Sequence, residues 1–75
     1  MKFDWTYDEK SFTWVTGTNE SGCGVYQDEE SHKWNVNIVY EGDLTILGKE
    51  FDSREEAMDA AVVEWMRIHD SFNHN

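Results

Sequence analysis

The fold of this chain is decided by the stretch KWNVNIVY, residues 33–40. Apolar residues recur at every second position of this stretch, at Trp34, Val36, Ile38 and Tyr40. Successive side chains of a β-strand point to opposite faces of a sheet, so this period indicates a strand with one buried face. We therefore expect residues 33–40 to form a strand that lies on a hydrophobic core.

A helix is predicted for residues 53–70. Ser53 and Glu56 have the spacing of a capping box, in which the serine oxygen accepts a hydrogen bond from the amide three residues later. Apolar residues then recur at helical spacing, at Ala57, Ala61, Trp65, Ile68 and Phe72. This stripe has to be buried, and the apolar face of the strand at 33–40 is the expected partner.

Alternating runs at residues 3–7 and 12–16 predict a hairpin, and two further strands are expected at about 23–27 and at 44–51. Gly48 inside the last run suggests a bulge, and polar stretches at 17–22, 28–32 and 41–43 indicate turns. The predicted fold class is α+β: an antiparallel sheet of four to five strands with one C-terminal helix packed across one face. We expect a single domain over residues 1–75, made of an N-terminal hairpin (1–17), a three-stranded sheet (23–51) and the helix (53–70).

The charge of the chain limits its partners. Sixteen Asp and Glu residues face six Lys and Arg residues, which gives a net charge of −10. Such a charge repels nucleic acid and anionic membranes, so neither is expected as a direct partner. A basic protein surface is the expected partner, because opposite charges speed association.

The cysteine content indicates a reducing compartment. Cys23 is the only cysteine, so the chain forms no internal disulfide, whereas small secreted domains usually contain several. No stretch approaches the roughly 20 apolar residues of a membrane span. We expect a cytoplasmic protein, with Cys23 acting as a small apolar residue of the core.

Part of the chain resembles a known layout. The residues that carry the resemblance are Gly24-Val25, Lys33-Trp34, Val36, Ile38, Gly42, Leu47-Gly48, Phe51-Asp52-Ser53 and Glu55-Glu56-Ala57. This pattern is similar to the DNA-binding domain of plant ethylene-response factors and to the arm-binding domain of phage integrases. The resemblance implies a three-stranded sheet packed on a helix, with the outer sheet face in the DNA major groove.

The chain departs from those families where they contact DNA. They carry arginines after the Gly-Val pair and along the outer sheet face, whereas this chain has Tyr26, Gln27 and the acidic residues 28–30, with Asn35 and Asn37 facing outward. Phosphate contact needs several cations. We therefore do not expect the DNA-binding role of these families in this chain.

Clusters of carboxylates are the candidate partner-binding residues. They lie in two predicted turns and on the side of the helix opposite its apolar stripe, together with two apolar residues that could anchor a partner. The candidates are Asp28, Glu29, Glu30, Glu41, Asp43, Glu55, Glu56, Asp59, Val63 and Met66. The alternative is that this acidic surface serves only solubility. We expect no catalytic residues, no metal site and no cofactor.

The function that these features favour is that of a small acidic inhibitor without enzymatic activity. We expect it to be encoded by a phage or mobile element and to occupy, by mimicry of nucleic acid, the basic nucleic-acid-binding surface of a defence protein in the host cytoplasm. In size, acidity and layout the chain resembles, as a class, the phage-encoded anti-CRISPR and anti-restriction proteins. Two alternatives are an acidic structural, assembly or regulatory protein and a diverged nucleic-acid-binding domain of the integrase-arm type.

Overall fold

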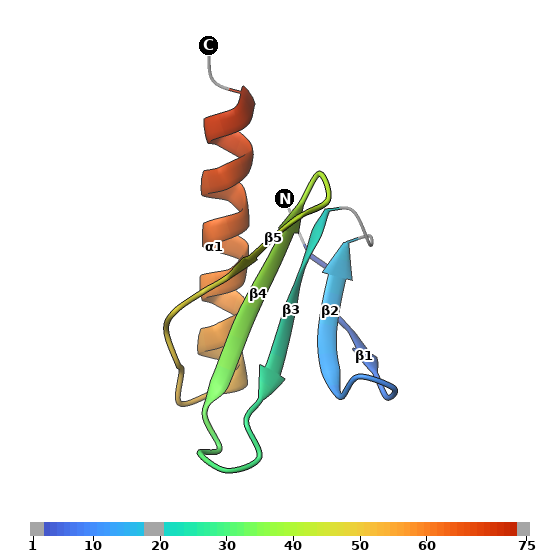
Figure 1. Cartoon of the computed structure of the whole chain (residues 1–75), viewed down its shortest axis with the longest axis vertical. Coiled ribbons are helices and arrows are strands. Elements are labelled where there is room, and N and C mark those ends of the chain that lie inside the picture. Colours follow the sequence, from blue (N-terminus) through green and yellow to red (C-terminus); the bar gives the residue numbers. More distant parts are fainter. Residues whose placement is uncertain (1–2, 18–20, 74–75) are drawn as a thin grey trace.

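The described part of the chain forms an antiparallel sheet and one helix. The computed structural model describes residues 3–17 and 21–73, with side chains described up to Ser71. The elements in chain order are β1 (Thr6–Asp8), β2 (Thr13–Gly17), β3 (Gly22–Gln27), β4 (Trp34–Tyr40), β5 (Asp43–Ile46) and α1 (Arg54–Asn73). The five strands neighbour one another in that same order (Figure 1). The α+β prediction is thereby confirmed.

The core lies between α1 and the middle of the sheet. Val36 and Ile38 of β4 and Ala57 and Ala61 of α1 are fully buried. The alanines have short side chains, so the helix can approach the strands closely. Cys23 and Val25 of β3 complete the buried cluster, as the predicted packing of the two apolar faces required.

Aromatic side chains close the upper end of this core. The Trp65 ring stacks on His69 with centroids 5.1 Å apart and meets Tyr40 edge-on at 5.7 Å. Trp34, Trp65 and Ile68 are partly buried and pack against the core cluster. The side chain of Phe72, also predicted to belong to the apolar stripe, lies outside the described side chains.

The prediction of a strand over residues 44–51 was wrong. β5 ends at Ile46, the Leu47 amide still donates to the Val36 carbonyl at 3.0 Å, and the chain then pairs with β4 again only at Phe51. There the Trp34 amide donates to the Phe51 carbonyl at 2.8 Å, and the Phe51 amide donates back at 2.9 Å. Gly48 lies at a bend between these points, so it marks the exit from the sheet instead of a bulge within a strand. Glycine and the charged residues after it are poor strand formers, which explains the early end.

The boundaries of the other elements are close to the predicted ones. β1 begins at Thr6, later than the expected residue 3, and α1 continues to Asn73, beyond the expected residue 70. Ser53 caps the helix as predicted, because the Glu56 amide donates to its Oγ at 3.2 Å. Residues 18–20, at the centre of the predicted 17–22 loop, lie outside the described residues.

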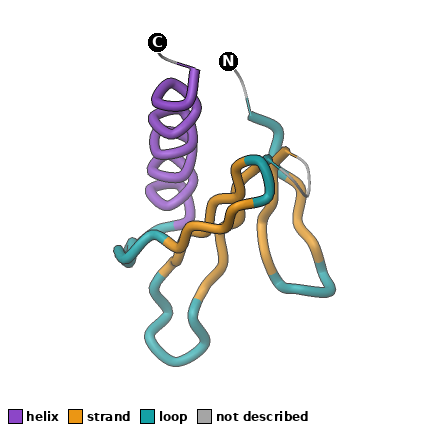
Figure 2. Tube along the Cα trace, turned by 45° about the horizontal axis from the view of Figure 1, so that its top comes forward, coloured by secondary structure: helices purple, strands orange, loops and turns teal. Residues whose placement is uncertain are grey.

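The helix covers only part of its sheet face. α1 lies along β3 and β4, while the β1–β2 hairpin lies away from it (Figures 1 and 2). Trp14 of β2 pairs in register with Tyr7 of β1 and Val25 of β3, so all three share the face that carries the core. Beyond the helix, that face is lined by aromatic side chains.

Candidate partner-binding surface

Two segments that are distant in sequence meet at one end of the molecule. The Ser31 hydroxyl donates to the Glu50 carboxylate at 3.5 Å, and Lys33 forms an ion pair with Asp52. The β3–β4 turn therefore lies beside the segment that leads into α1, at the lower end in Figure 1. The carboxylates gathered here, which we call the acidic end, are Asp28, Glu29, Glu30, Glu50, Asp52, Glu55 and Glu56.

Lys33 lies among these carboxylates. Its hydrogen bond to Asp52 and the charge of Asp52, followed by the charges of Glu50 and Glu56, raise the pKa of Lys33. The same hydrogen bond and charge lower the pKa of Asp52. Both groups are exposed, so the pair adds little to stability. The pair marks where the two acidic segments meet, and the backbone pairing of Trp34 with Phe51 holds them together.

Within the turn, Asp28 has a structural role. Its Oδ1 accepts hydrogen bonds from the amides of Glu30 at 2.8 Å and Ser31 at 3.2 Å, the pattern of an Asx turn. His32 has a φ of 60° and donates its amide to the Asp28 carbonyl, which closes the turn. Glu29 and Glu30 are exposed and are the better placed of the three for contact with a partner.

A second group of predicted residues runs along the helix. Val63 is 66 % exposed and Met66 is 39 % exposed, and Glu55 and Asp59 are exposed on the same side, since residues three or four apart share one face of a helix. We call Glu55, Asp59, Val63 and Met66 the outer helix stripe. Because Glu55 belongs to both groups, the stripe continues from the acidic end.

Glu41 and Asp43 lie elsewhere. They belong to the β4–β5 turn, at the upper end in Figure 1. The seven residues of β4 separate this turn from the acidic end by about 20 Å, more than twice the Debye length of about 8 Å in physiological salt. Their fields therefore add little to those of the acidic end.

The Glu41–Asp43 turn has its own surroundings. The Glu41 residue has a φ of 50°, and its amide donates to the Ser21 hydroxyl at 3.3 Å. Asp43 and Thr45 line a groove of about 290 Å³ together with Glu64, Arg67 and Ile68 of α1. Arg67 already pairs with Glu64 one helical turn away, so this groove presents no strong excess of one charge.

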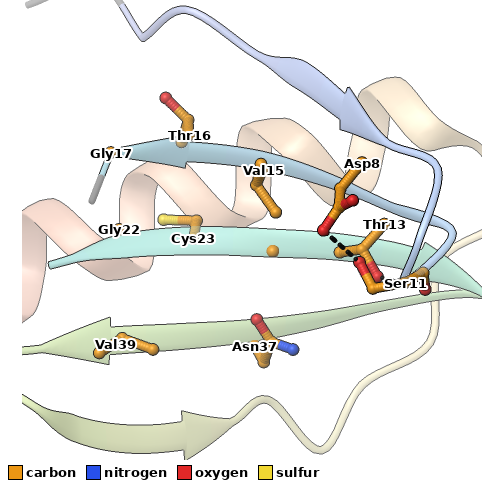
Figure 3. A pocket seen from close by; sticks show the side chains of 11 residues that line it. Asp8, Ser11, Thr13, Val15, Thr16, Gly17, Gly22, Cys23, Asn37 and Val39 are labelled. Carbon is orange, nitrogen blue, oxygen red and sulfur yellow. Dashed lines mark hydrogen bonds between the residues drawn. The ribbon is translucent and has the colours of Figure 1, made fainter. Parts of the chain in front are cut away.

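The uncovered sheet face holds a pocket of about 360 Å³ (Figure 3). Its floor is β3, where Gly22 and Gly24 face outward, and Val15, Asn37 and Val39 stand on the neighbouring strands. These glycines are explained by packing. A Cβ at Gly24 would come within 2.4 Å of the Asn37 Oδ1, and one at Gly22 within 2.1 Å of the Thr16 carbonyl.

The polar groups on the rim of that pocket serve the β1–β2 turn. The Asp8 carboxylate accepts from the Lys10 amide at 3.0 Å and from the Ser11 hydroxyl at 2.9 Å (Figure 3). The Thr13 hydroxyl donates to the Ser11 carbonyl at 2.9 Å. These polar groups are therefore engaged in shaping the turn. We do not assign a ligand to this pocket.

Cys23 is buried against the helix. Its Sγ lies 3.6 Å from the Ala61 carbonyl oxygen, and burial raises the pKa of the thiol to about 12. The thiol therefore stays protonated at neutral pH, where only the thiolate would act as a nucleophile. Among the described residues, no group of three or more His, Cys, Asp or Glu side chains is placed to hold a metal ion. Over the same part of the chain, no helix is long and apolar enough to cross a membrane.

Sequence reasoning missed two members of the acidic end. Glu50 and Asp52 join it because Phe51 pairs with Trp34, and this pairing places the 50–53 segment beside the β3–β4 turn. The signal in the sequence that could have revealed this pairing is Phe51, an apolar residue between Glu50 and Asp52. The prediction includes Phe51 in one continuous strand over residues 44–51. No protein-family model, curated protein or solved structure matches this chain significantly.

Proposed function

We propose that this protein is a small acidic inhibitor that binds a basic surface of another protein and excludes nucleic acid from it. The observation that carries the proposal is the acidic end, where carboxylates from separate segments meet and continue into the outer helix stripe. Carboxylates gathered in this way can replace the phosphates that such a surface normally holds. We place the protein in the cytoplasm of a host cell, where a chain with a single cysteine needs no oxidising compartment.

Two features support a contact surface over plain solvation. The carboxylates come from two segments that meet at the Ser31–Glu50 and Lys33–Asp52 contacts, so their fields add over short distances. Val63 and Met66 are apolar and exposed beside them, and apolar residues within a charged surround are typical of protein interfaces. The charges would chiefly speed association, and the apolar side chains would slow dissociation.

The test is a pair of matched charge reversals. Glu55→Lys with Asp59→Lys alters the outer helix stripe, and Glu41→Lys with Asp43→Lys alters the opposite end by the same change in charge. A partner is captured from a bacterial lysate with the wild-type protein and identified. Each variant then competes with nucleic acid for that purified partner at low and at physiological salt.

We expect the first double variant to lose inhibition and the second to keep it. Val63→Ser should also weaken inhibition, whereas Leu44→Ser should not, although Leu44 is 62 % exposed on the uncovered sheet face. If both reversals weaken binding equally, net charge alone attracts the partner and the proposed surface is wrong. Unchanged inhibition in every variant would favour the alternative that these acidic residues serve only to keep the protein soluble.

The nucleic-acid-binding alternative has a separate test. Asn35 and Asn37 lie on the uncovered sheet face, where the resembled families contact DNA, but no arginine accompanies them there. We expect no mobility shift of duplex DNA by the isolated protein, even at low salt. A salt-dependent shift would favour the integrase-arm type of function over the inhibitor.

A further inference from the structure

A pocket lies on the core-bearing sheet face where the helix ends its cover. Its volume is about 230 Å³. Four aromatic side chains, one amide and one carboxylate line it: Tyr7, Phe12, Trp14, Trp34, Gln27 and Glu29. We call it the aromatic pocket. It opens beside the acidic end, since Glu29 belongs to both.

The register of the strands builds this pocket. Tyr7 lies directly opposite Trp14, and Gln27 lies directly opposite Trp34, all on one face of the sheet. α1 begins only at Arg54 and packs on β3 and β4, so the rings contributed by β1 and β2 lie beyond its main contacts, and the Arg54 side chain reaches over Trp14. The Tyr7 and Trp14 rings meet at 5.2 Å between centroids, which gives the pocket an aromatic wall.

Phe12 is the residue that folding explains least. Its φ is 54°, in the left-handed region that a bulky side chain rarely adopts, and its side chain is 71 % exposed. A phenylalanine here carries backbone strain and gains little burial in return. Such an outlier is a reason to seek a function for the side chain. Its ring lines the pocket, where a bound group could contact it.

The chain itself shows what these rings attract. The guanidinium of Arg54 lies over the Trp14 ring, 4.5 Å from its centroid. Aromatic faces attract cations electrostatically, and a planar guanidinium can also stack on them. Arg54 occupies one face of the Trp14 ring without lining the pocket, and its guanidinium pairs with Glu55 at 3.5 Å, which offsets its repulsion of a second cation.

Hydrogen-bond acceptors stand beside the rings. Glu29 is exposed and contributes a carboxylate to the pocket. The Gln27 amide nitrogen donates to the His32 carbonyl at 3.1 Å, which orients the side chain and leaves its oxygen as the acceptor. Guanidinium carries five N–H donors in a plane and suits a site that combines aromatic faces with such acceptors.

We propose that the aromatic pocket binds the guanidinium group of an arginine side chain. The likeness to the Arg54–Trp14 contact, the carboxylate of Glu29 and the net charge of −10 all favour a cation. The inference rests on the proposed function only for the source of the arginine, a basic partner protein. The pocket itself can be assayed with a free small molecule.

The assay titrates Nα-acetyl-arginine amide into the full-length protein and follows the indole N–H signals by NMR. The matched ligand is Nα-acetyl-citrulline amide, which keeps the shape of arginine and lacks its charge. We expect saturable shifts of the Trp14 and Trp34 signals with the arginine compound. The citrulline compound should not produce them, and the Trp65 signal should stay in place with both.

Matched variants assign the binding to the pocket. Phe12→Ala should raise the dissociation constant about two- to fivefold, the usual effect of one exposed cation–aromatic contact. Leu44→Ala removes a similarly exposed apolar side chain elsewhere and should leave the dissociation constant unchanged. Glu29→Gln should also weaken binding, while Glu30→Gln, the same change one residue away in the same turn, should not.

Two results would overturn the assignment. One is equal shifts of the indole signals with the arginine and citrulline compounds, which would show that the pocket does not recognise the positive charge. The other is equal weakening by the pocket variants and their controls, which would show that arginine binds the acidic surface at large. If either result appears while the wild-type protein still inhibits its partner, the inhibitor proposal stands and this one fails. If arginine binds the pocket but no partner is inhibited, the reverse holds.

Discussion

The core-bearing face of the sheet has two halves that are covered in different ways. Under α1, over β3 and β4, the sheet presents Val25, Val36 and Ile38, all fully buried beneath the helix alanines. Beyond the helix, over β1 and β2, it presents Tyr7 and Trp14, which remain partly open to solvent. The helix shields the first half from solvent. In the second half, the large side chains of the strands themselves do most of the shielding.

The difference shows why the aromatic residues are distributed as they are. A helix can approach a sheet closely only where small or aliphatic residues leave room, and the buried cluster consists of such residues. Where no helix lies above, wide rings shield the strands themselves, but four rings meeting at the edge of the cover cannot fill all the space between them. The aromatic pocket is the space that remains.

The largest effect should come from the half beneath the helix. Ile38→Ala removes a side chain with no solvent exposure and should lower the free energy of unfolding by about 2–5 kcal/mol. Phe12→Ala, in the open half, should change it by less than about 0.5 kcal/mol, since this ring is largely exposed. Urea unfolding of both variants measures the contrast. Comparable losses would mean that the two halves are equally well packed.

Enlarging a helix alanine should break the close approach of the two layers. Ala61→Leu adds three carbons at a fully buried position and should lower stability by about 1–3 kcal/mol through overpacking. Ala60→Leu, on the half-buried flank of the same helix, is the control and should be nearly neutral. Thermal unfolding of the pair gives the comparison. A stabilised Ala61→Leu variant would reveal unfilled space under the helix.

The titration of the buried Cys23 thiol tests whether water reaches the helix-covered half of the core. The pKa of Cys23 is raised from 9.0 to about 12 by burial, so between these values the unfolded chain releases a proton that the folded chain retains. Stability from this group is therefore fully present below pH 9 and is lost as the pH rises toward 12. At pH 10 the loss should be about 1.4 kcal/mol relative to pH 8.

Urea unfolding at pH 8 and pH 10 tests this, with Cys23→Ala as the control that lacks the thiol. The wild type should lose more stability than the variant over this interval. Equal losses in the two proteins would show that the thiolate forms readily in the folded state, and the helix-covered half would then admit water.

The smallest effect should come from the point where the helix cover begins. Ser53 accepts the Glu56 amide, so Ser53→Ala should lower the free energy of unfolding by about 1 kcal/mol, and Ser53→Asp should be nearly neutral. Differential scanning calorimetry compares the three proteins. An alanine variant as stable as wild type would indicate that the first turn of α1 frays without consequence for the packing of Ala57.

The regular parts of the molecule could be predicted from local patterns. The alternation in residues 33–40 and the capping spacing from Ser53 identified the central strand, the helix and the residues that pack between them. The end of β5 was missed because apolar residues still occur at Leu47 and Phe51, although the chain leaves the sheet between them. Periodicity records which side chains are apolar, and it does not record where backbone pairing stops.

The candidate surfaces depended on contacts between distant segments. Nothing in the turn at residues 28–32 indicates that Glu50 and Asp52 lie beside it, since that proximity follows from the Trp34–Phe51 pairing. The aromatic pocket also could not be predicted from the sequence, because it depends on the register of the strands and on the residue at which the helix begins. Glu41 and Asp43 look equivalent to the other acidic residues in the sequence, and only the length of β4 separates them.

The meander order of the strands has a consequence for how the molecule assembles. Every strand pairs with its neighbour in sequence, so the sheet can grow hairpin by hairpin without closing long loops, and local connectivity of this kind favours rapid folding. The helix follows the whole sheet in the chain and must reach back to β3 and β4. During synthesis, the apolar face of the sheet therefore stays exposed until α1 has left the ribosome and packed on it. Repulsion between the many acidic residues should keep neighbouring nascent chains from associating through this face during that time.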